Sequence, residues 1–77
     1  MTTRAFIIIE TRVGKAKQVL QALRLVVGVR SADVVTGTFD IIALIEASDM
    51  AAVADLVTGQ VQGIDGVLRT ITCVAAG

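Results

Sequence analysis

The residues best suited to binding chemistry stand in one short segment, residues 34–43, where a glycine and a carboxylate lie three positions apart between two apolar runs. This pattern predicts a strand, a tight turn and a second strand, with Gly37 and Asp40 in the turn. Such a turn exposes backbone N–H groups, which attract an anion, and one negative side chain, which attracts a cation. The combination suits a small zwitterion better than a nucleic acid or a metal ion.

Each residue of this turn also has a structural explanation. Gly37 can serve a positive φ, or it can let a ligand carboxylate approach the backbone N–H groups near Thr36, Thr38 and Phe39. Asp40 can bond its own backbone or accept a hydrogen bond from a ligand ammonium group. Phe39, one of only two aromatic residues, can anchor an interface or form a pocket wall. The sequence leaves these alternatives open.

The composition removes several classes of function. Lys and Arg together number seven, as do Asp and Glu, so no net positive field draws in a phosphate backbone, and we expect no direct binding to nucleic acid. The chain has no histidine, which weakens serine and cysteine catalysis and the usual zinc sites. We therefore expect no catalytic residue, no metal and no cofactor. The lone Cys73 lies in an alternating apolar run and is expected to be a buried structural thiol.

Strand-like and helix-like segments alternate along the chain. The first amphipathic helix begins near Lys15 and is expected to stop at Gly28. The second is capped by Ser48 and Asp49 and is expected to end or fray around residues 57–61, because Gly59 costs about 1 kcal/mol relative to alanine. Short runs rich in β-branched residues predict strands at residues 4–11, 29–35, 41–46 and 67–74.

The order strand-helix-strand occurs twice, which predicts an internal repeat within one domain spanning residues 1–77. Two such units interleave into an α+β, ferredoxin-like βαββαβ fold, a four-stranded antiparallel sheet with both helices on one face. Residues 5–9 and 41–45 are apolar at every position, so these strands should be buried on both faces. The second cover is expected to be the sheet of another copy, which gives a dimer.

The overall hydropathy supports the same expectation. Hydrophobic residues make up 55% of the chain and its mean hydropathy is +0.81, although a domain of this size buries only about 60% of its unfolded surface. A membrane-spanning helix needs about 18 consecutive apolar residues, and residues 5–9 form a run of only five. The N-terminus enters a strand pattern almost at once, without the features of a signal peptide. We expect a cytoplasmic protein that does not enter the membrane.

The chain resembles, over nearly its full length, the effector-binding or RAM domain of the Lrp/AsnC feast/famine regulators, in a stand-alone form. The resemblance rests on the order and spacing of four segments, residues 5–9, 35–40, 47–49 and 66–72. It implies a dimeric α/β barrel formed by sheet-to-sheet packing, and a ring of dimers such as an octamer or decamer. It also implies that amino acid effectors bind between dimers, near the turn that contains Gly37 and Asp40.

One part of the full-length family pattern is missing. No helix-turn-helix fits before Arg4, so the resemblance does not imply DNA binding by these residues. The chain could instead act on a full-length Lrp/AsnC relative by mixed assembly, or through another partner.

Thr70 and Thr72 share one side of the last strand, where their hydroxyls could bind a ligand or could simply favour the strand. The main alternative function is a small dimeric α+β barrel enzyme, an isomerase or cofactor-free monooxygenase, whose acid or base would be Asp33, Glu10 or Glu46. A third possibility is oligomerisation without any ligand.

Overall fold

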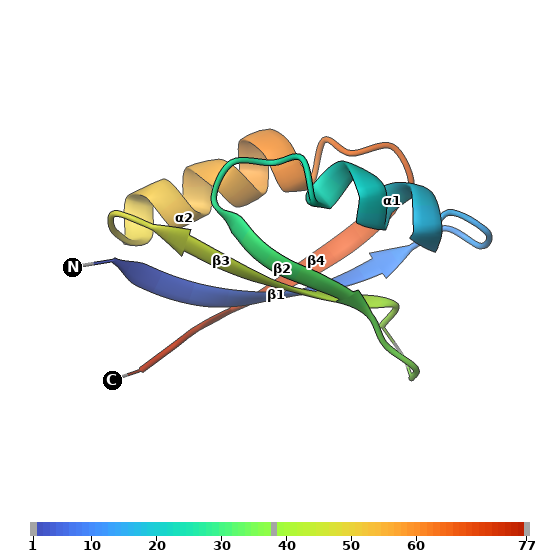
Figure 1. Ribbon diagram of the computed structural model, residues 1–77, viewed down its shortest axis with the longest axis horizontal. Coiled ribbons are helices and arrows are strands. Elements are labelled where there is room, and N and C mark those ends of the chain that lie inside the picture. The colour runs from blue at the N-terminus through green and yellow to red at the C-terminus, as the bar shows by residue number, and fades with distance from the viewer. Residues whose placement is uncertain (1, 38, 77) are drawn as a thin grey trace.

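Four strands form one antiparallel sheet in the computed structural model, which describes residues 2–37 and 39–76 (Figure 1). The spatial order of the strands is β2-β3-β1-β4, and both helical segments cover the same face of the sheet. This arrangement confirms the predicted ferredoxin-like βαββαβ fold. The elements in chain order are β1 (Thr3–Thr11), α1 (Ala16–Leu23), β2 (Val29–Val34), β3 (Ile41–Ala47), α2 (Met50–Leu56), a π-helical turn η1 (Val57–Val61) and β4 (Val67–Val74).

The core lies between the helices and the covered face of the sheet. Every second residue of the two central strands points into it, as strand periodicity requires. Burying one isoleucine or leucine side chain stabilises the fold by about 1.5–3 kcal/mol. The fully buried large side chains are Ile7, Ile9, Val19, Leu23, Ile41, Ile45, Val53 and Val61.

The two helices end differently from the sequence-based expectation. We expected the first helix to continue to Gly28, but α1 ends at Leu23. Beyond it the N–H groups of Leu25 and Val26 bond carbonyls only three residues back, at 3.1 Å each, which tightens the chain and closes the helix early. Gly28 still adopts the expected left-handed backbone, with φ of +101°, but in the turn that leads into β2.

The second helix is interrupted where Gly59 predicted a disturbance. Asp49 caps α2 as expected, because its carboxylate accepts a 2.8 Å hydrogen bond from the Ala52 N–H. From Val57 the backbone widens into η1, and the Gln62 N–H donates to the Val57 carbonyl, five residues back, at 2.8 Å. The helix is therefore widened at residues 57–61, and its buried residues Val57 and Val61 still face the core.

An internal repeat is visible in two equivalent glycines. Gly28 and Gly66 have φ values of +101° and +100°, and each ends the connection from a helix to the following strand. The Gly28 carbonyl accepts from the Glu46 N–H at 2.9 Å, and the Gly66 carbonyl accepts from the Arg12 N–H at 2.8 Å. Each glycine therefore ties one half of the chain to the other, which confirms the predicted repeat.

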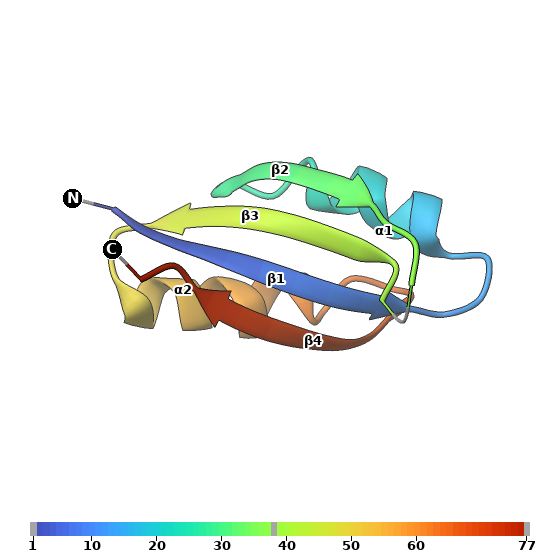
Figure 2. The same ribbon diagram turned by 90° about the horizontal axis from the view of Figure 1, so that it is seen from below.

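The helices leave one face of the sheet uncovered (Figure 2). The centre of this face is apolar. We call this surface the open face; its central residues, brought together by the strand register, are Phe6, Ile8, Ile42, Leu44, Ile71 and Cys73. Phe6 and Ile71 are each 43% exposed, and Ile42 is 37% exposed. Cys73 was expected to be buried, but it is exposed because its position opposite Phe6 directs it to the open face.

Candidate functional site

One backbone hydrogen bond closes the turn between β2 and β3, and a second bonds this turn to β1. The Val35 N–H donates to the Asp40 carbonyl at 2.8 Å, and the Asp40 N–H donates to the Ile9 carbonyl at 3.0 Å. Gly37 has a φ of +127°, and a Cβ atom built on it would meet nothing within 4 Å. The backbone conformation, rather than crowding, therefore favours glycine at this position. Thr36 and Gly37 are exposed, and Thr38 lies outside the described residues.

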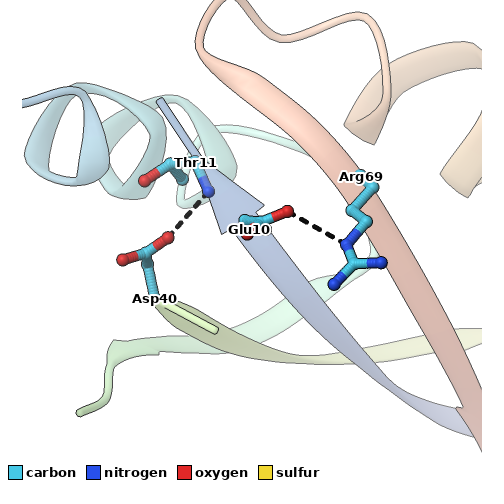
Figure 3. A network of polar contacts seen from close by, with 4 residues as sticks. All are labelled: Glu10, Thr11, Asp40 and Arg69. Atoms are coloured by element: carbon cyan, nitrogen blue, oxygen red, sulfur yellow. Dashed lines mark hydrogen bonds and ion pairs between the residues drawn. The ribbon is translucent and has the colours of Figure 1, made fainter. Parts of the chain in front are cut away.

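The Asp40 carboxylate fastens this turn to the end of β1. Its Oδ2 atom accepts a 2.8 Å hydrogen bond from the Thr11 N–H, in a partly buried position (Figure 3). A hydrogen bond to an ionised carboxylate is shorter and stronger than one between neutral groups. Asp40 thus bonds the backbone of a neighbouring strand, and within residues 2–37 and 39–76 no donor to its Oδ1 atom is found.

An ion pair stands beside the turn on the open-face side of the sheet. The Arg69 Nε donates to Glu10 Oε1 at 3.0 Å (Figure 3), and the Arg69 guanidinium lies 5.2 Å from the centre of the Phe39 ring. Phe39 is half-buried. The turn, the end of β1 and the start of β4 therefore meet at one end of the sheet.

Sequence analysis did not select Arg69, Glu10 or Thr11 as part of this site. The sequence held a signal for Glu10 and Arg69. In the ferredoxin-like fold β1 and β4 are antiparallel neighbours, and strand alternation places both of these side chains on the open face. The Glu10–Arg69 pairing follows from the register. The contact between Thr11 and Asp40 depends on the path of the turn, which the residue pattern does not specify.

Thr70 and Thr72 share one side of β4, as predicted, but on the opposite face from Arg69. The Gln62 Nε2 donates to Thr70 Oγ1 at 3.0 Å. Thr72 lines a groove of about 380 Å³ between β4, α2 and η1, together with residues that include Val57 and Val74. The side chains of these two threonines therefore lie on the helix-covered face of the sheet, opposite to Glu10 and Arg69.

Of the carboxylates considered for catalysis, two are half-buried in ion pairs and one is exposed. Glu10 and Glu46 are each paired with an arginine, and Asp33 is exposed beside a polar hollow of about 330 Å³ lined also by Arg24 and Arg30. Residues 2–37 and 39–76 contain no cluster of three or more potential metal ligands. In that same part of the chain, no helix is long and apolar enough to span a bilayer.

Comparison with known proteins agrees with this fold. The family model described as the Lrp/AsnC ligand binding domain matches residues 4–76. No curated protein matches the chain in sequence.

Among solved structures, FFRP-DM1 is 27% identical with a TM-score of 0.91, over 96% of this chain and 99% of that one. The protein TTHA0845 from Thermus thermophilus is 29% identical with a TM-score of 0.92, over 97% and 94%. The transcriptional regulator NMB0573 from Neisseria meningitidis, solved as a complex with L-Met, is 22% identical with a TM-score of 0.87, and this chain covers only 50% of it.

The fold and the family match define a regulatory ligand-binding domain of the ferredoxin-like class. The chain belongs to the Lrp/AsnC ligand-binding domain family. This family consists of regulatory domains rather than enzymes.

Proposed function

We propose that this chain is a non-enzymatic effector-sensing and assembly domain that spans residues 1–77. It pairs with a second copy through the open face, and the pairs assemble into a ring. It binds a small-molecule effector, an amino acid, at contacts between pairs near residues 36–40. A ligand at a subunit contact stabilises the assembled state by mass action, which couples the effector concentration to assembly.

The observation that carries the assembly part is the apolar centre of the open face. Six side chains form it, and Phe6, Ile42 and Ile71 remain at least one-third exposed in the single subunit. Removing apolar surface from water stabilises by roughly 25 cal/mol per Å². Charged pairs stand at both ends of this face, Glu10–Arg69 at one end and Arg30–Glu46 at the other. An apolar centre with a charged rim is the usual composition of a protein interface.

The effector part rests on the turn and on the family. The turn combines exposed backbone at Thr36 and Gly37 with the Asp40 carboxylate, whose Oδ1 can accept from an ammonium group. The NMB0573 regulator, which has a similar fold, was solved in complex with L-Met. An amino acid is therefore the first class of effector to test. Thr70 and Thr72 remain candidates for contact with a ligand that is bound at the turn of a neighbouring subunit.

The route to transcription is a separate part of the proposal. The two described helices both belong to the ferredoxin-like fold, so the described residues include no helix-turn-helix. We propose that this domain acts in the cytoplasm through another protein, such as a full-length Lrp/AsnC regulator that joins the same assembly.

Sedimentation of the wild type and of an Ile42→Asp variant tests the assembly. A charge at the centre of the open face should dissociate the pair, because a buried unpaired charge is costly. Leu25→Asp is the matched control, since Leu25 is 85% exposed in the turn after α1 and should not affect assembly. A monomeric wild type, or equal behaviour of the two variants, would contradict pairing through this face.

Thermal unfolding with a panel of L-amino acids, including L-methionine, tests the effector. A ligand at about ten times its Kd adds about 1.4 kcal/mol of stability, which raises the Tm of a domain this small by several degrees. If no amino acid at millimolar concentration changes either the Tm or the sedimentation, the effector part is wrong.

A further inference from the structure

Two ion pairs join a central strand to an edge strand, one at each end of the sheet. Glu10 on β1 pairs with Arg69 on β4, and Glu46 on β3 pairs with Arg30 on β2. In each pair the glutamate lies on a central strand and the arginine lies on an edge strand, shortly after Gly28 or Gly66. The two pairs are offset within the repeat, since Arg30 lies two residues after Gly28 and Arg69 lies three residues after Gly66. They still allow two glutamate-paired arginines to be compared in different surroundings.

Arg69 is held in place by more contacts than Arg30. Its Nε lies 3.0 Å from Glu10 Oε1, whereas the Arg30 Nε lies 3.6 Å from Glu46 Oε1. The Phe39 ring stacks on the Arg69 guanidinium at 5.2 Å, and no such aromatic partner is found for Arg30 among residues 2–37 and 39–76. Because Phe39 belongs to the β2–β3 turn, Arg69 is held against the candidate site and Arg30 is not.

A register shift lies beside each of the two arginines, and the one beside Arg69 adjoins the candidate turn, whereas the shift between Val29 and Ser31 lies at the other end of the sheet. The pairing of β1 with β4 shifts between Glu10 and Thr11, so that Glu10 faces Arg69 whereas Thr11 faces Val67. Such a bulge redirects neighbouring side chains and is common next to binding sites. Here it lies beside Thr11, whose N–H is bonded to Asp40. The bulge, the turn and Arg69 therefore form one connected corner of the molecule.

The remaining hydrogen-bonding capacity of Arg69 fits a carboxylate. Glu10 occupies Nε, no hydrogen bond to the two terminal nitrogens is found among residues 2–37 and 39–76, and the Arg69 side chain is 60% exposed. Two parallel N–H donors at the end of a planar guanidinium match the two oxygens of a carboxylate. Because Glu10 and Phe39 already restrict the side chain, less conformational entropy is lost when a ligand binds.

We propose that Arg69 recognises the carboxylate of the effector at this turn, with Glu10 and Phe39 as positioning residues. This inference rests on the proposed function, since it assigns a role within the same effector site. A free amino acid supplies both the carboxylate that Arg69 binds and an ammonium group that can approach Asp40. The exposed pair itself contributes little to folding, so replacing Arg69 should leave the subunit folded.

Titration calorimetry on the wild type, Arg69→Gln and Arg30→Gln tests the proposal, with the panel of L-amino acids and, for those that bind, the corresponding amino acid amides. Arg30→Gln is the matched control, because it makes the same charge change at the other glutamate-paired arginine on an edge strand, which is 63% exposed. We expect Arg69→Gln to raise the Kd at least about tenfold and Arg30→Gln to change it by less than about twofold. Removing the ligand carboxylate as an amide should weaken wild-type binding about as much as Arg69→Gln does.

Two further variants separate recognition from general charge. Arg69→Lys keeps the charge without the planar fork and should give an intermediate Kd, and Glu10→Gln should weaken binding less than Arg69→Gln does. The amide should bind the Arg69→Gln variant almost as well as the acid does, because the group that distinguishes them is gone.

The outcomes distinguish this inference from the proposed function. If the wild type binds an amino acid and Arg69→Gln binds it equally well, the role of Arg69 is wrong while the effector site stands. If the wild type binds no amino acid, both are wrong. If Arg69→Gln changes sedimentation without changing the Kd, Arg69 contacts a carboxylate of a neighbouring copy, and the inference is overturned.

Discussion

The two halves of this chain build the same βαβ unit with helices of different length. Val53 in α2 follows Val19 in α1 by 34 positions, whereas Gly66 follows Gly28 by 38. The four additional residues fall between the equivalent helix positions and the equivalent glycines, where η1 is found. The comparison teaches that the fold tolerates an extra turn in one helix when that turn widens and keeps an apolar residue, Val61, directed at the core.

The largest expected difference between the halves is at the two equivalent glycines. A Cβ at Gly66 would lie 2.9 Å from Lys15 Cβ and 3.0 Å from a methyl group of Val19, both of which are close to the α1 backbone. A Cβ at Gly28 would meet the flexible end of Leu56 at 2.7 Å and the Glu46 carbonyl oxygen at 3.3 Å. We expect Gly66→Ala to lower the free energy of unfolding by about 2–4 kcal/mol and Gly28→Ala by about 1–2 kcal/mol.

Urea denaturation of both variants at one protein concentration measures this difference. If both variants lost the same free energy of unfolding, crowding of the Gly66 position against α1 would not contribute to stability.

A smaller effect is expected at Val61, which has no counterpart in the first half. It is fully buried, so Val61→Ala should lower the free energy of unfolding by about 1.5–3 kcal/mol through lost burial and a residual cavity. The equivalent pair Val19 and Val53 should each lose a similar amount on replacement by alanine. Thr58→Ala, an exposed neighbour in η1, serves as control and should change stability by less than about 0.5 kcal/mol. An unaffected Val61→Ala variant would place the extra turn outside the core.

The smallest effect is expected in the turn that joins the halves. Asp40→Ala removes the acceptor of the partly buried Thr11 N–H and should lower the free energy of unfolding by about 1 kcal/mol. Asp33→Ala, at an exposed carboxylate on β2, is the control and should have almost no effect. Amide hydrogen exchange at Thr11 is the direct measurement: it should become faster in the Asp40 variant alone, and unchanged protection would mean that the hydrogen bond does not hold the turn.

Sequence patterns predicted the architecture well because each element carried its own signal. The β-branched runs predicted all four strands, and Asp49 and Gly59 predicted the start of the second helix and its disturbance. The end of α1 was missed because Leu25, Val26 and Val27 continue an apolar pattern. The chain instead tightens after Leu23, which leaves Leu25 85% exposed and Val27 89% exposed.

The candidate site was less accessible to sequence reasoning. The turn was found because glycine and aspartate act through local backbone geometry. Arg69 and Thr11 lie far from it along the chain, and they reach it only through strand register and a bulge. Their contribution therefore required the tertiary structure.

The pairing of β1 with β4 also determines how this domain can be tethered. The Ala75 N–H donates to the Arg4 carbonyl at 2.9 Å, so both ends of the described chain lie at the same corner of the sheet (Figures 1 and 2). The β2–β3 turn lies at the other end of β1, about 25 Å away for a strand of this length. A fluorescent reporter or a second domain fused at either end would be attached at that corner. It would lie close to a fusion at the opposite terminus and away from the turn.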